Sequence, residues 1–205
     1  GENNQPNQVT STDTWQIRPM YEYLTGVDVD GKDVQQKVPQ LATEWNLEPD
    51  GKSYRFKLRK GVQLHYGQGE FTAQDVVYSW QHIIAGDSRH PHTPRWKATI
   101  EDVQVVNDYE VVFKNRMADL AFIWALGEME GGFEIMSKKD ADSRNGKLPG
   151  LGERPIAGTA KSPAGRGWFT VILSKVIVTR VSSPLAFFSP SARSRIIETL
   201  VAKAP

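Results

Sequence analysis

The sequence predicts a mixed α/β fold, α+β in character, in which antiparallel β-hairpins pack against helices. Apolar and polar side chains alternate over residues 54–58, which is typical of a strand with one buried face. The same alternation over 103–105 and 109–113, on either side of an Asn-Asp pair, indicates a second hairpin. Between the two, apolar residues recur at helical spacing over 76–84, so we expect a helix to pack on the hairpins.

The N-terminal part of the chain is expected to hold a polar lead-in, a short helix and the first hairpin. Residues 1–12 are rich in Asn, Gln and Thr, which predicts a mobile lead-in. Apolar side chains at helical spacing indicate a helix over residues 15–24. A strand over 41–47 then joins residues 54–58 through a Pro-Asp-Gly turn, because Pro presets φ and Gly accepts a positive φ.

The helix between the hairpins has clear boundaries, from residue 71 to residue 86. Thr72 is placed as its N-cap, and Asp75 follows three residues later, as a capping box requires. Phe71 before the cap and Val76 inside the helix predict a hydrophobic staple. Gly86 is suited to end the helix.

The pattern after this helix is weaker. A loop with Pro91 and Pro94 is expected before the second hairpin, and residues 118–126 indicate a short helix. Residues 133–136 are expected to form a strand, and residues 140–155 a loop.

The composition is that of a globular protein. The chain has 205 residues, enough for one or two domains, and its hydrophobic content of 39% argues against disorder. No run approaches the length of a transmembrane helix, and the chain lacks the basic and then apolar start of a signal peptide. Gly1 therefore begins a mature chain, a trimmed chain or a fragment. The absence of cysteine excludes disulfides and thiolate metal sites.

The charge balance changes near residue 160. Residues 161–205 carry seven Lys or Arg and one acid, whereas the first 160 residues carry 18 basic and 23 acidic side chains. Such a change marks a boundary. The basic residues are scattered among Ser, Val and Ile and do not gather on one face, so we expect no nucleic-acid binding.

The chain carries no motif of an enzyme, since it lacks a nucleophile elbow, a P-loop, a zinc-binding helix and a dinucleotide fingerprint. His90 and His92 form a pair that can begin a metal site, but no third ligand accompanies them. We therefore expect no catalytic residue, no metal and no cofactor. The acids Glu44, Glu48 and Asp50 cluster at a hairpin tip, where solvated charge explains them better than an acid–base site.

Three stretches of the chain resemble one protein family. The longest is VPQLATEWNLEPDGKSYRFKLRKGVQLHYGQGEFTAQDVVYSW, residues 38–80. IEDVQVVNDYEVVF at 100–113 and RPIAGT at 154–159 follow in the expected order. Over roughly residues 38–159 the chain resembles family 5 of the extracytoplasmic solute-binding proteins, the peptide-, dipeptide- and nickel-binding components of ABC importers.

The resemblance implies a truncated fold of the periplasmic-binding-protein type II kind, in which two lobes close on a ligand and a third domain fills the base. It assigns residues 1–37 to the start of the main lobe and 38–153 to a small accessory lobe, built as hairpin, helix, hairpin and helix. Residues 154–205 become a return segment and a tail. No residues remain to build the second closing lobe.

The implied function is to bind a peptide or similar small solute at the periplasmic or extracytoplasmic surface and to present it to an ABC permease in the membrane. A monomer is expected. Because closure buries a ligand from both sides, a chain without the second lobe is expected to bind weakly. The alternatives are a stand-alone docking module and a truncated fragment without function.

The resemblance places the ligand near Thr12, Asp13, Thr14 and Trp15. In the peptide binders of the family the ligand lies extended and pairs with protein strands. Asp13 is the candidate partner of a peptide amino group. Trp96, in the loop expected after the helix, is the candidate cover for a ligand side chain. The competing interpretations are a helix cap for Asp13 and a surface-loop anchor for Trp96.

The resemblance ends after Thr159. The family continues Gly-Thr with Gly-Pro-Tyr, whereas Ala160, Lys161 and Ser162 follow here, and the charge change begins at the same place. Residues 160–205 are therefore interpreted as a non-homologous ending, from a shifted or fused reading frame. The alternative is a divergent but genuine lobe.

Limited proteolysis with mass mapping separates these two interpretations of the tail. If the ending is foreign, we expect a protected core from about residue 38 to residue 155 and rapid loss of residues 160–205. Protection through to residue 205 would contradict a foreign ending and assign the tail to a packed domain.

Overall fold

The computed structural model of the chain describes residues 6–8, 17, 20–27, 37–127, 132–145 and 156–159. The chain divides into two units, Gly1–Ala164 and Gly165–Pro205, and all of these residues lie in the first. The predicted ligand residues 12–15 and the tail from residue 160 lie outside the described residues. No helix in the described part of the chain has the length and hydropathy that crossing a bilayer requires.

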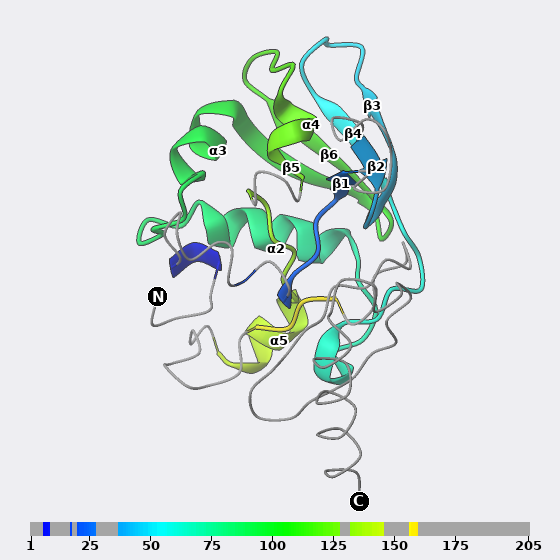
Figure 1. The fold of residues 1–205 in the computed structure, drawn as a ribbon, viewed down its shortest axis with the longest axis vertical. Helices are drawn as coiled ribbons and strands as arrows, with labels where there is room; N and C mark the ends of the chain where they lie inside the picture. The colour runs from blue at the N-terminus through cyan, green and yellow to red at the C-terminus, as the bar shows by residue number, and fades with distance from the viewer. Residues whose placement is uncertain are drawn as a thin grey trace, which may run out of the picture. The chain divides into compact units, whose positions relative to one another are not determined.

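The largest element is a four-stranded antiparallel sheet (Figure 1). Its strands are β3 (Ala42–Leu47), β4 (Tyr54–Leu58), β5 (Ile100–Asn107) and β6 (Glu110–Asn115). They lie in the order β3-β4-β6-β5. Strands β3 and β4 form one hairpin and β5 and β6 the other, so both predicted hairpins are confirmed.

One face of the sheet is buried because the inward-facing residues of β4 lie opposite the inward-facing residues of β6. Tyr54 lies opposite Phe113, and Phe56 lies opposite Val111. Phe56, Val111 and Phe113 have no exposed surface. The rings of Phe56 and Phe113 meet edge to face, with centroids 5.3 Å apart. The alternation that predicts the strands therefore also selects the core face.

Helix α2 (Ala73–Ile83) packs against β5 and β6 and runs beneath the sheet in the view of Figure 1. In the predicted capping box, the Asp75 carboxylate accepts hydrogen bonds from the Thr72 backbone N–H at 2.8 Å and from the Thr72 hydroxyl at 3.3 Å. Phe71 and Val76, the expected staple, are both fully buried. The helix ends three residues before Gly86, close to the predicted boundary.

The region expected as a loop around Pro91 and Pro94 contains helix α3 (Thr93–Thr99). Pro94 lies in its first turn, where a backbone N–H would have no partner within the helix in any case. The loop prediction treated Pro94 as a helix breaker and is wrong for this reason. Trp96 consequently extends from a helix.

Two further helices differ from the prediction. Helix α4 (Phe122–Ala125) is a single short turn inside the predicted range 118–126, and Leu120 before it is 97% exposed. Helix α5 (Lys138–Ser143) occupies residues expected to be loop. It starts there because the Ser137 hydroxyl accepts a hydrogen bond from the Asp140 N–H at 3.1 Å, as an N-cap does. A short 3₁₀ turn, η3 (His65–Gly67), precedes α2.

The expected mobile lead-in contains an ordered 3₁₀ turn, η1 (Pro6–Gln8). Asn7 is buried, and its carbonyl accepts a hydrogen bond from the Arg89 N–H at 2.7 Å. The lead-in prediction is therefore wrong for residues 6–8. Polar composition gave no sign of this contact with a segment far along the chain.

The helix predicted over residues 15–24 is wrong for residues 21–23, which are not helical. The carbonyls of Tyr23 and Leu24 accept hydrogen bonds from the N–H groups of Leu41 and Ala42, at 3.1 and 2.9 Å. Strand β1 (Thr25–Val27) then pairs with β2 (Lys37–Pro39). Pairing with a distant segment thus overrides the helical spacing of the apolar side chains.

Residues 132–137 form a buried segment between α4 and α5, called the connector from here on. The strand predicted at 133–136 is absent, yet residues 133–137 have no exposed surface. The connector bonds to three separate parts of the chain. The Ile135 N–H donates a hydrogen bond to the Glu22 carbonyl at 3.0 Å, and the Ser137 N–H donates one to the Ala157 carbonyl at 2.7 Å. The Met136 N–H donates to the Ser79 hydroxyl oxygen at 2.8 Å.

Residues 156–159 lie beside the N-terminal segment of residues 20–25. The Tyr21 hydroxyl donates a hydrogen bond to the Ile156 carbonyl at 3.2 Å, and the Thr159 hydroxyl bonds the Glu22 carboxylate. Gly158 has no room for a side chain, because an added Cβ would lie 2.6 Å from the Met20 carbonyl oxygen. Segments from the two ends of the first unit therefore meet at the connector.

Replacing Gly132 tests the packing of the connector. An added Cβ would lie 2.5 Å from the Ala125 carbonyl oxygen and 3.3 Å from the Trp96 ring. We expect Gly132→Ala to lower the free energy of unfolding by about 1–3 kcal/mol in urea titrations, as overpacking does. Gly86→Ala is the matched control, since no atom lies within 4 Å of the added Cβ. Equal stability of the two variants would contradict the close packing.

Candidate functional site

Trp96 is the one predicted ligand residue that the structure describes, and it is fully buried. Its indole N–H donates a hydrogen bond of 2.6 Å to the Gly132 carbonyl. The rings of Phe122 and Phe133 meet it edge to face, with centroids 6.1 and 6.0 Å away. The interpretation as a surface-loop anchor is therefore wrong. A contact between Trp96 and a ligand stays a prediction.

Next to Trp96, a carboxylate lies in the core. Glu134 on the connector has no exposed surface, and its Oε1 accepts a hydrogen bond from the Tyr23 hydroxyl at 3.2 Å. Its Oε2 lies 3.3 Å from Nε2 of His90, a side chain that is also fully buried. Glu134, on the connector, thus contacts the N-terminal segment through Tyr23 and the residues that precede α3 through His90. Sequence reasoning missed this group.

The two ring nitrogens of His90 have different surroundings. Its Nδ1 accepts a hydrogen bond from the His92 backbone N–H at 3.2 Å. Its Nε2 faces Glu134 Oε2 at 3.3 Å, in close contact but without the geometry of a hydrogen bond. His90 is therefore bonded to the chain through Nδ1 and packs against the buried carboxylate through Nε2. Within the described ranges, no three His, Asp or Glu side chains gather closely enough to hold a metal ion.

The buried acid affects the electrostatics of its neighbours. Burial raises the pKa of the Tyr21 hydroxyl well above its usual value, and the negative charge of Glu134 adds to the shift. Tyr21 therefore stays protonated and donates to the Ile156 carbonyl. A carboxylate that accepts a hydrogen bond from Tyr23 and lies against the His90 ring inside the core suits structural positioning, because no substrate can reach it from solvent.

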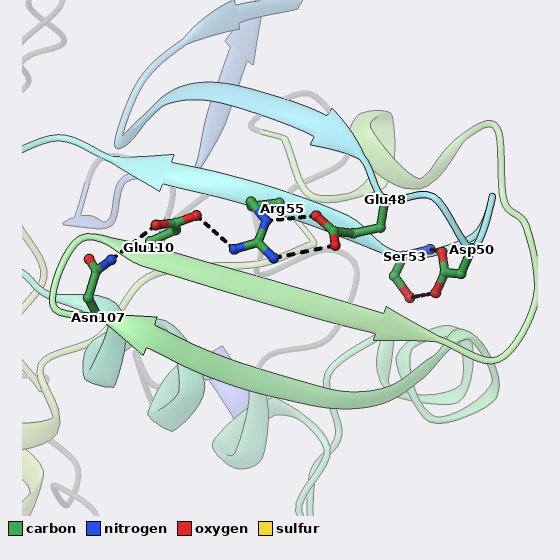
Figure 2. Close-up of polar contacts among 6 residues, drawn as sticks. All are labelled: Glu48, Asp50, Ser53, Arg55, Asn107 and Glu110. Atoms are coloured by element: carbon green, nitrogen blue, oxygen red, sulfur yellow. Dashed lines mark hydrogen bonds and ion pairs between the residues drawn. The ribbon is translucent and has the colours of Figure 1, made fainter.

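A second polar group lies on the outer face of the sheet (Figure 2). The guanidinium of Arg55 bonds both carboxylate oxygens of Glu48, at 2.7 and 3.3 Å, and reaches Glu110 at 2.8 Å. Asn107 donates to the other oxygen of Glu110 at 3.0 Å. This network ties the two hairpins together across β4 and β6.

The acids at the hairpin tip are held ionised. The Arg55 side chain lowers the pKa of Glu48, and hydrogen bonds from Ser53 and from the Lys52 N–H lower the pKa of Asp50 to about 2. Glu44 pairs with Lys57 at 2.8 Å. Neither Glu48 nor Asp50 is suited to exchange a proton near neutral pH, which agrees with solvated charge and not with an acid–base pair.

Comparison with known families gives one match that covers more than half of the chain. Residues 36–153 match the model described as "Bacterial extracellular solute-binding proteins, family 5 Middle". This range holds the four-stranded sheet, α2, α3, α4, α5 and the connector.

Individual relatives carry names of several ligands. A dipeptide-binding protein of Pseudomonas aeruginosa is 26% identical over 165 residues, covering 66% of this chain and 31% of the relative. Heme-binding protein A of Haemophilus influenzae is 34% identical over 137 residues, covering 58% of this chain and 24% of the relative. The chain thus spans less than a third of the length of these curated relatives.

Solved structures share the fold. A dipeptide-binding protein of Pseudoalteromonas in complex with Met-Leu superposes with a TM-score of 0.62 at 24% identity. The match covers 77% of this chain and 33% of that one. The mixed α/β architecture with antiparallel sheets is therefore that of part of a periplasmic binding protein.

The low pKa of Asp50 predicts a pH-dependent contribution to stability. Since its pKa is lowered from 3.8 to about 2 in the folded chain, the contribution is present above pH 4 and is lost as the pH falls through 2. We expect the difference in urea midpoint between wild type and Asp50→Asn to be constant from pH 7 to 4 and to shrink towards pH 2. Asp87→Asn, at an exposed site outside the network, should show no such trend.

Proposed function

The chain belongs to family 5 of the bacterial extracellular solute-binding proteins, and from this premise we propose that it is part of the peptide-binding component of an ABC importer. The family binds solutes and is not a family of enzymes. The observation that carries the proposal is the match over residues 36–153, together with relatives named as dipeptide-binding proteins.

A short peptide is the solute that the relatives support best. Relatives in Pseudomonas aeruginosa are named as dipeptide- or di/tripeptide-binding proteins, and the superposed Pseudoalteromonas protein holds Met-Leu. Heme is the ligand in the name of the Haemophilus relative, which makes it the competing solute. Peptide binding by strand addition relies on main-chain hydrogen bonds and needs few specific side chains.

The remaining parts of the proposal follow from the intact relatives. Residues 1–37 would start the main lobe, 38–153 would form the accessory lobe, and 154–205 would hold the return segment and the tail. The protein would act as a monomer at the extracytoplasmic or periplasmic surface and present its solute to a membrane permease. In this division, residues 20–25 and 156–159, which contact each other, both belong to the parts outside the accessory lobe.

Calorimetric titration of the 205-residue chain with Met-Leu, N-acetyl-Met-Leu, heme and Ni²⁺ tests this function. We expect Met-Leu to bind with a dissociation constant weaker than about 1 µM, that is, less favourably than about −8 kcal/mol, because only one side of the ligand is enclosed. N-acetylation should weaken binding by about tenfold or more, since it removes the ammonium that Asp13 is proposed to bind.

The matched variants separate the role of Asp13 from general effects. Asp13→Asn should remove the preference for Met-Leu over its N-acetyl form, whereas Asp30→Asn should retain it. Tighter binding of heme or Ni²⁺ than of either peptide would contradict the peptide assignment. Binding of Met-Leu tighter than about 1 µM would contradict the expectation that a second lobe is needed.

A further inference from the structure

We infer that Glu134 is a positioning residue, which holds the N-terminal segment of residues 20–25 against the accessory lobe through the hydroxyl of Tyr23. The inference rests on the proposed function only for its link to ligand binding. Its structural part concerns the described residues alone.

The contacts of Glu134 join segments far apart in the sequence. Tyr23 and Glu134 are separated by 111 positions, and their contact lies where the N-terminal segment crosses the connector. One residue further along, the Ile135 N–H donates to the Glu22 carbonyl at 3.0 Å. The Glu134 side chain and the Ile135 backbone therefore bond two adjacent residues of the N-terminal segment, Tyr23 and Glu22.

A carboxylate at this place depends on its hydrogen bond from Tyr23. Glu134, Tyr23 and the His90 side chain are 0–1% exposed, so water cannot replace that hydrogen bond if it is lost. Removing one partner of a buried charged group leaves that group unsatisfied, which is more costly than the loss of a surface contact. The N-terminal segment is consequently fixed at Tyr23 and cannot slide along the connector without breaking this group.

The connector that carries Glu134 also contacts Trp96, a candidate ligand residue. The Gly132 carbonyl, two residues before Glu134, accepts the hydrogen bond of the Trp96 indole. In the sequence, Tyr23 follows Trp15 by eight residues. Under the proposed function, fixing Tyr23 therefore restrains the chain that leads on from the proposed ligand residues.

Hydrogen exchange of the full 205-residue chain tests the positioning role. We expect Glu134→Gln and Tyr23→Phe each to speed amide exchange in peptides covering residues 20–27 by about tenfold, because the first weakens the Tyr23 hydrogen bond by removing the charge of its acceptor and the second removes its donor. Peptides from β4 and β6 should exchange as in wild type. Glu44→Gln, which removes an exposed ion pair with Lys57, is the matched control and should change neither region.

The double variant distinguishes positioning from general destabilisation. If Tyr23 and Glu134 act through one contact, Tyr23→Phe combined with Glu134→Gln should exchange no faster at residues 20–27 than the faster single variant. Additive effects, or equal acceleration in β4 and β6, would overturn the inference. If Glu134→Gln does not fold, Tyr23→Phe alone decides, since it removes only a hydroxyl.

Hydrogen exchange in the presence of a ligand distinguishes a failure of this inference from a failure of the proposed function. With excess Met-Leu, wild type should gain protection in peptides covering residues 12–27, and Glu134→Gln should gain at least about threefold less. Absence of protection in wild type would contradict the proposed function and leave the exchange test of Glu134 intact. Equal protection in both proteins would overturn the link between Glu134 and the ligand segment.

Discussion

The fold depends on the requirement that a buried backbone must find partners for its polar groups. The connector runs through the core without belonging to a sheet, so it has no neighbouring strand to bond. Its N–H groups are satisfied instead by Glu22, by Ser79 on α2 and by Ala157. Each of these bonds fixes one element, and together they set where the N-terminal segment, α2 and residues 156–159 lie.

The charged contacts of Arg55 and of Glu134 illustrate how burial changes the energetic contribution of similar contacts. Arg55 lies between Glu48 and Glu110 on the outer face, and its side chain is 34% exposed, so water screens the attraction and can replace a lost partner. Glu134 is enclosed, and neither of its contacts can be replaced by solvent. The outer network therefore adds modestly to the pairing of the hairpins, whereas the inner group fixes a position.

The sequence predicted the elements whose signals are local. The hairpins follow from alternation, and α2 follows from Thr72 and Asp75 at its start, so both could be located without the structure. The course of residues 21–25 depends on bonds to residues 40–42, and no local pattern contains that information. Glu134 left only a weak signal, a single acid inside the apolar run Phe133 to Met136, and its partners could not be found from the sequence.

The long separation between partners has a consequence for the order of folding. The hairpins close over a few residues, whereas Tyr21 meets a residue 135 positions away and Tyr23 one 111 positions away. In a chain made from its N-terminus, the backbone of the segment can pair early with residues 37–42, but the hydroxyls of Tyr21 and Tyr23 find their partners only after residues 134–156 have followed. The backbone pairing of this segment can therefore precede its side-chain contacts by most of the length of the first unit.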